Sequence, residues 1–236
     1  MRAFLTRRTW FALASFLALT SASWADEKPQ RAAKGSEVSE AVKQIKPFLV
    51  YLRAAEEQEP ADRASRRGAL GVVLNARGQV LTNHSAIKKY TQLEATLADG
   101  RKCTVKNIES DARLDLAIVQ LETTQPLSAV ALESDEAVKA GAPVFVVSTA
   151  DAHSLGDSLF ATRGIIAYEP GEKKFDGTFL GVDAAIGPGA PPGPLFSERG
   201  KLVGLVVCAE LSPQYNRAVP IKQIAERLAH WDKNKK

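Results

Sequence analysis

Histidine, on which much hydrolytic chemistry depends, is scarce in this sequence. Among its 236 residues only three are histidines: His84, His153 and His230. Hydrolysis at neutral pH commonly uses an imidazole as general base, because its pKa lies near about 6.5. A hydrolytic site of this kind would need one of these three side chains. None of them stands in a Cys/His cluster with the spacing of a metal site, so we expect no metal and no cofactor.

The two cysteines, Cys103 and Cys208, are the other reactive side chains. Each falls inside its own strand-like apolar run, and cysteine is among the most often buried residue types. An oxidising compartment would permit a bridge between them. We favour two separate buried thiols.

Residues 1–25 have the features of a secretory signal. Arg2, Arg7 and Arg8 form a basic start, residues 10–19 are apolar, and small residues precede Asp26. The apolar stretch is short for an uncleaved membrane anchor. We therefore expect a signal peptide at 1–25, a mobile leader at 26–35, and export to the periplasm or the extracellular space if the host is bacterial.

The charge balance follows from this signal. The whole chain has 31 basic and 27 acidic residues, and removing the three signal arginines leaves 28 against 27. A nearly neutral mature chain does not predict nucleic-acid binding. We expect no nucleic-acid partner, and no membrane association after the signal is cleaved.

The elements that would position any site are mainly strands. Short β-branched and apolar runs are separated by Gly, Pro, Asn and Asp, which favours an all-β barrel or sandwich. Hairpin turns are predicted at 75–78 and 99–100. A short helix is predicted at 37–46, ended by Pro47, and an amphipathic helix follows Pro220.

Three segments carry a family resemblance and occur in a fixed order. They are residues 71–87 (GVVLNARGQVLTNHSAI), residues 99–119 (with DGRK at 99–102 and SDARLDLAIV at 110–119), and residues 183–206 (with DAAIGPGAPPGPL at 183–195 and LVGLV at 202–206). Together they resemble the trypsin-like serine proteases of the HtrA (Deg) family. Residues 218–221 fit the family's closing strand.

The resemblance implies an all-β fold of two six-stranded antiparallel β-barrels, with a short N-terminal helix, a C-terminal helix and a peptide cleft between the barrels. We place the first barrel half at 36–126, the connection at 127–142, and the second half with the C-terminal helix at 143–236. We expect no PDZ domain. No motif in the sequence predicts an oligomeric state.

The same resemblance locates the family's catalytic positions. A His base, an Asp and a Ser nucleophile should occur in that chain order. Their positions are taken here by Ser85, Asp115 and Pro191. The loop that should form the oxyanion hole contains Gly189 and Ala190. Only the aspartate is retained, so we expect no active catalytic residue.

Two other side chains could rescue activity. His84 would reach the base position only if the chain slipped by one residue, which would turn neighbouring side chains to the wrong face. Ser197 is the next serine downstream of Pro191, but it stands in a turn sequence where serine bonds locally. His153 lies in a polar stretch and His230 on the polar side of the last helix.

Three hypotheses follow for function. The first is an inactive pseudoprotease that binds a protein or an extended peptide in the inter-barrel cleft. The second is an active serine endopeptidase with a rearranged site. The third is a structural or assembly subunit that uses the surface of the barrels.

Overall fold

A computed structural model describes residues 34–54, 68–149, 159–171, 178–186, 191–207 and 215–233. The expected signal peptide and most of the leader, together with His153, Gly189, Ala190 and Cys208, lie outside the described residues. Within these ranges no helix has the length and apolar character needed to cross a membrane.

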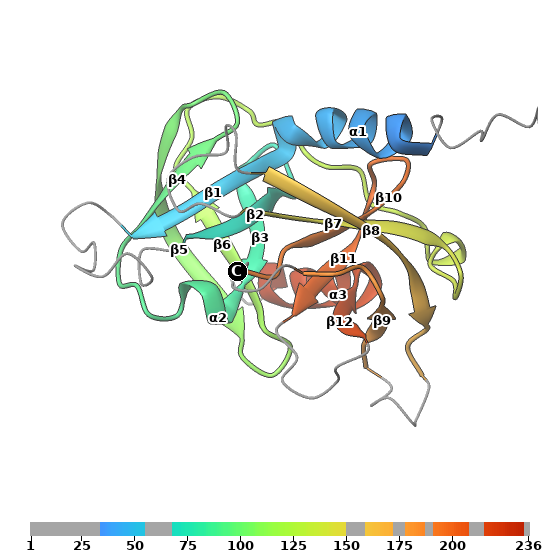
Figure 1. The fold of residues 1–236 in the computed structure, drawn as a ribbon. Helices are drawn as coiled ribbons and strands as arrows, with labels where there is room; N and C mark the ends of the chain where they lie inside the picture. The colour runs from blue at the N-terminus through green and yellow to red at the C-terminus, as the bar shows by residue number, and fades with distance from the viewer. Residues whose placement is uncertain are drawn as a thin grey trace, which may run out of the picture. The chain divides into compact units, whose positions relative to one another are not determined.

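The first barrel closes from six strands near the N-terminus. These are β1 (Leu49–Ala54), β2 (Ala69–Val73), β3 (Gln79–Asn83), β4 (Leu93–Leu97), β5 (Lys102–Asp111) and β6 (Leu116–Leu121). All neighbours are antiparallel, in the order β1-β2-β3-β6-β5-β4 (Figure 1).

The second barrel repeats this topology. Its strands are β7 (Pro143–Thr149), β8 (Leu159–Tyr168), β9 (Leu180–Val182), β10 (Pro194–Ser197), β11 (Leu202–Val207) and β12 (Asn216–Pro220). Read around the barrel from β7, the order is β7-β8-β9-β12-β11-β10, which matches the first barrel strand for strand. The predicted pair of six-stranded antiparallel barrels is confirmed, although the sequence has no visible repeat.

Short helices flank the barrels. They are α1 (Lys34–Ile45), a 3-10 turn (Lys46–Phe48), α2 (His84–Ile87), a second 3-10 turn (Asp135–Ala137) and α3 (Ile221–Lys233). Pro47 was expected to end the first helix, and it lies inside the 3-10 turn that follows α1. Both terminal helices were predicted and are confirmed.

Both predicted hairpin turns are present, and both need a glycine. Gly78 and Gly100 have φ angles of 85° and 87°, a region that costs residues with a side chain about 1 kcal/mol or more. Asn75 completes the first turn, because its side-chain oxygen accepts the N–H of Arg77 at 3.0 Å.

Cys103 lies in β5 opposite Ala95 and is a free thiol. Its side chain is half-buried, which is more exposed than the sequence suggested. Burial raises the pKa of this thiol above the usual value of 9.0.

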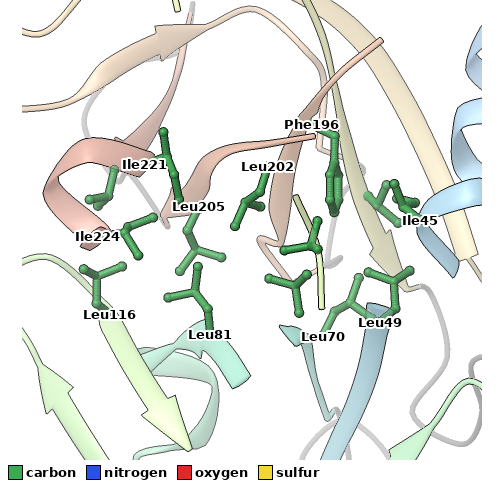
Figure 2. Close-up of a cluster of buried hydrophobic side chains, with 14 of the residues drawn as sticks. Ile45, Leu49, Leu70, Leu81, Leu116, Phe196, Leu202, Leu205, Ile221 and Ile224 are labelled. Carbon is green, nitrogen blue, oxygen red and sulfur yellow. The ribbon is translucent and has the colours of Figure 1, made fainter. Parts of the chain in front are cut away.

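An apolar cluster lies between the two barrels. It receives Leu70, Leu81 and Leu116 from the first barrel and Phe196, Leu202 and Leu205 from the second, and Ile221 and Ile224 of α3 join it (Figure 2). These side chains are at most 4% exposed. Each barrel also has a separate interior cluster. Because full burial of one such side chain is worth about 1.5–3 kcal/mol, the shared cluster is a large part of what holds the barrels together.

The connection between the barrels is tied to the second barrel through Glu133. This carboxylate accepts the Ser197 hydroxyl at 2.7 Å and the Ser134 N–H at 3.1 Å, and the Lys201 ammonium lies 3.6 Å away. Burial alone would raise the pKa of Glu133, but these hydrogen bonds and the nearby positive charges of Lys201 and Arg199 lower it below its usual value of 4.5.

Because its pKa is lowered on folding, ionised Glu133 stabilises the folded state at pH values above about 4.5. Glu133→Gln should lower the free energy of unfolding at neutral pH by about 1–2 kcal/mol, because the charge-assisted bonds from Ser197 and Lys201 are lost. The stabilisation disappears as pH falls below about 4.5, so the variant and the wild type should converge in acid.

Denaturant unfolding at about pH 7, 5 and 3.5 measures this convergence. Glu226→Gln, which alters an exposed carboxylate of α3, is the control and should change stability by less than about 0.5 kcal/mol. A Glu133→Gln deficit that stays constant at every pH would contradict this role.

Candidate functional site

Ser85 is positioned by the end of β3. Asn83 is the last residue of that strand, pairs with Leu116, and precedes the single turn of α2. The backbone N–H of His84 donates to the carbonyl oxygen of Asp115 at 3.1 Å, so the two segments remain in register beyond the strand. Ser85 is thereby carried to the side of Asp115.

Asp115 is positioned by a turn between β5 and β6. Its φ angle is 51°, in the left-handed region that only glycine, asparagine and aspartate visit readily. The carboxylate of Asp111 accepts the N–H groups of Arg113 at 3.0 Å and Leu114 at 3.2 Å, which stabilises the turn before Asp115. The turn therefore determines where the Asp115 carboxylate points.

The Asp115 carboxylate accepts three hydrogen bonds from two residues. Its Oδ1 accepts the Ser85 backbone N–H at 2.6 Å. Its Oδ2 accepts the Ser85 hydroxyl at 3.0 Å and the Asn83 side-chain amide at 3.1 Å. The structure thus brings Ser85 and Asp115 into direct contact.

Asn83 continues this network into the second barrel. Its side-chain amide also donates to the carbonyl oxygen of Val206 at 2.9 Å, and the Val206 N–H donates to the carbonyl oxygen of Gly193 at 3.0 Å. Only 1% of Asn83 is exposed. Sequence reasoning missed this role, which the position of a polar residue at the end of an apolar strand could have indicated.

Pro191 lies in the second half of the chain, two residues before Gly193, and no hydrogen bond joins it to Ser85 or Asp115 among the described residues. It is half-buried, and its carbonyl oxygen accepts the hydroxyl of the buried Ser148. Two residues later, a Cβ on Gly193 would stand 2.1 Å from the carbonyl oxygen of Val147, so the turn requires glycine there. Pro191 is therefore anchored by its backbone.

The residues considered as substitutes are placed elsewhere or otherwise engaged. No hydrogen bond joins the His84 ring to the Asp115 carboxylate within the part of the chain that the structure describes. The Ser197 hydroxyl donates to Glu133, 64 positions away in the chain, rather than bonding locally as its turn sequence suggested. His230 is exposed on α3.

Both oxygens of the Asp115 carboxylate already accept hydrogen bonds from neighbouring residues. The Ser85 hydroxyl donates its only hydrogen bond to Asp115. No cluster of three or more His, Cys, Asp or Glu side chains that could hold a metal ion occurs among the described residues.

Residues 69–205 match the model of the trypsin-like peptidase domain, a span that includes Ser85, Asp115 and Pro191. The chain belongs to the trypsin-like peptidase domain family. Its two closed barrels agree with this membership.

Relatives of this trypsin-like chain are HtrA-type proteases, as the sequence motifs predicted. It is 32% identical over 139 residues to the periplasmic pH-dependent serine endoprotease DegQ of Escherichia coli. It is 29% identical over 140 residues to the periplasmic serine endoprotease DegP of the same organism. A probable DegP-like endoprotease of Chlamydia trachomatis is 28% identical over 156 residues.

These matches cover part of each protein. They include 57% of this chain for DegQ and DegP and 64% for the chlamydial protein, but only 28–30% of each relative. The chain therefore spans less than a third of the length of these relatives.

Two substitutions can distinguish what the left-handed backbone of Asp115 and what its three hydrogen bonds contribute to the free energy of unfolding. Asp115→Ala should lower the free energy of unfolding by about 2–4 kcal/mol, because it leaves the Asn83 amide short of an acceptor and places a Cβ in the left-handed region without hydrogen-bond compensation. Asp115→Gly loses the same bonds but relieves the backbone, so it should cost about 1 kcal/mol less.

Urea unfolding of the two variants measures the difference. Equal losses for Asp115→Ala and Asp115→Gly would show that the backbone conformation contributes nothing measurable.

Proposed function

We propose that this protein is an exported, catalytically inactive member of its family, a pseudoprotease that binds an extended peptide or protein segment instead of cleaving it. The observation that carries the proposal is the contact between Ser85 and Asp115, at the position where the family resemblance places a histidine. The names of its relatives, which are periplasmic endoproteases, support export to the periplasm.

The missing base is the first argument against catalysis. A serine hydroxyl holds its proton far above neutral pH and cannot accept a proton from another hydroxyl. Asp115 is no substitute, because both of its oxygens accept hydrogen bonds from Ser85 and Asn83. This leaves a nucleophile without an acceptor for its proton.

The residue at the nucleophile position is the second argument. Proline has neither a nucleophilic atom nor a backbone N–H, so Pro191 removes the nucleophile and one donor expected for the oxyanion hole. Loss of a single such donor slows acyl transfer by about 10²–10³-fold where it has been measured. The second barrel therefore lacks two of the groups that the reaction needs.

Binding can persist where catalysis is lost. The relatives are named as endoproteases, which act within peptide chains, and this chain has the trypsin-like peptidase domain. Strand-based scaffolds recognise extended segments through main-chain hydrogen bonds, which do not depend on a His or Ser side chain. We therefore place an extended peptide in the cleft beside Ser85 and Pro191.

A labelling experiment tests the loss of catalysis. The secreted form should show no covalent reaction with a fluorophosphonate probe and no time-dependent cleavage of casein, while E. coli DegP, as positive control, does both. Probe labelling that maps to Ser85 or Ser197 and disappears in Asp115→Ala would establish an active rearranged site.

A binding experiment tests the place of the peptide. His84→Trp adds bulk beside Ser85 and should weaken the binding of fluorescein-labelled unfolded casein by about tenfold, a loss of about 1.4 kcal/mol. Lys106→Trp, on the exposed side of β5, is the matched control and should bind like the wild type. Equal binding by both variants would contradict cleft binding and favour an assembly subunit that uses the barrel surface.

A further inference from the structure

A hollow lies on the first barrel, where the end of α1, the β4–β5 turn and the start of the inter-barrel connection meet. Its volume is about 350 Å³. It shares no lining residue with the network of Ser85, Asp115 and Pro191. An inference about it therefore does not rest on the proposed function.

The floor of the hollow is apolar. Val73, Leu97 and Leu127 line it, and all three belong to the core of the first barrel, with exposures of 2–7%. Pro47 and Pro126 form exposed parts of the wall. The volume is at the small end of the range for ligand sites, which suits one large side chain better than an extended ligand.

The rim of the hollow is cationic. Lys43, Lys46 and Arg101 contribute positive charges from two different elements, while Asp99 is the one carboxylate among the lining residues. The Lys46 ammonium has no ion pair or hydrogen bond within the described part of the chain. Two other exposed lysines in the described ranges do have partners: Lys106 pairs with Glu122 and Lys222 with Asp135.

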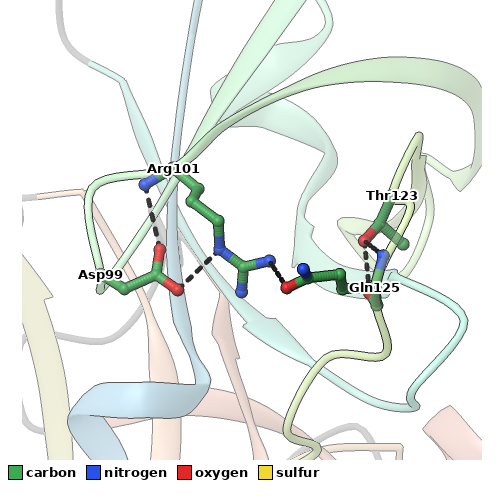
Figure 3. Close-up of polar contacts among 4 residues, drawn as sticks. All are labelled: Asp99, Arg101, Thr123 and Gln125. Carbon is green, nitrogen blue, oxygen red and sulfur yellow. Dashed lines mark hydrogen bonds and ion pairs between the residues drawn. The ribbon is translucent and has the colours of Figure 1, made fainter.

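Arg101 is held in place, as Figure 3 shows. Its Nε donates to Asp99 at 2.7 Å, and its Nη1 lies 3.4 Å from the side-chain oxygen of Gln125. Two hydrogen bonds with the Thr123 hydroxyl fix the backbone of Gln125. A guanidinium fixed in this way loses little side-chain entropy on binding, and its Nη2 group is not engaged by Asp99 or Gln125.

We propose that this hollow binds an acidic peptide segment in which one large apolar side chain is flanked by Asp or Glu residues. The apolar side chain occupies the floor of Val73, Leu97 and Leu127. The flanking carboxylates contact Arg101 from the β4–β5 turn and Lys46 from the 3-10 turn after α1. Cations from two elements match carboxylates on both sides of the apolar residue better than a single anionic group.

Fluorescence anisotropy with a labelled peptide, Ser-Gly-Glu-Asp-Phe-Glu-Asp-Gly-Ser, tests the proposal on the secreted chain. Binding should weaken by about tenfold when the acids become Gln and Asn, and again when Phe becomes Ser. It should also weaken as salt rises, because the rim charges are exposed.

Variants of the protein locate the binding. The double variant Lys46→Gln, Arg101→Gln should lose about tenfold in affinity. The double variant Lys106→Gln, Lys222→Gln removes the same charge elsewhere and should bind normally. Ser128→Trp, at an exposed lining position, should block the hollow, and thermal melting verifies that each variant is folded.

Several results would overturn the proposal. They are equal binding of the neutral peptide, equal losses in the two double variants, and full binding by Ser128→Trp. Binding of phosphatidylglycerol vesicles without binding of the peptide would assign the charges to a lipid surface. Self-association that Lys46→Gln, Arg101→Gln abolishes, again without peptide binding, would assign the hollow to a second copy of the chain.

Discussion

The apolar cluster between the barrels is the constraint on which the other features depend. The strands of each barrel pair only with strands of the same barrel, so strand pairing does not hold the two barrels against each other. The apolar cluster does so, through Leu81 and Leu116 of the first barrel and Leu202 and Leu205 of the second. The Asn83 amide donates a hydrogen bond to Val206 of the second barrel. This bond depends on the apolar cluster, because the cluster holds the two barrels next to each other.

This arrangement gives several positions of the family's motifs a role in the architecture. Asp115 contributes to folding through its turn, its backbone conformation and its bonds to Ser85 and Asn83, all of which are independent of a histidine. Gly193 is likewise required by the close approach of Val147. Both residues are therefore required by the architecture itself.

The two proposed binding surfaces use different physics. The cleft beside Ser85 would recognise any extended chain through main-chain hydrogen bonds, with little selection by sequence. The hollow at Arg101 would select by charge and by one apolar side chain. Asp99 holds Arg101 there, and the hydrogen bonds and charge of Arg101 lower the pKa of Asp99, so the Asp99 carboxylate remains ionised at neutral pH.

The sequence by itself determined the elements whose signals are local. Glycines at 78 and 100 specified two turns, and three ordered motifs carried the resemblance that predicted the barrel pair. Tertiary structure decided the rest. Strand β10 was not predicted, since it has four residues and begins with Pro194, and only pairing with β7 and β11 makes it a strand. The Glu133–Ser197 and Asn83–Val206 bonds join residues 64 and 123 positions apart, which local sequence pattern cannot reveal because closure of the barrels creates those contacts.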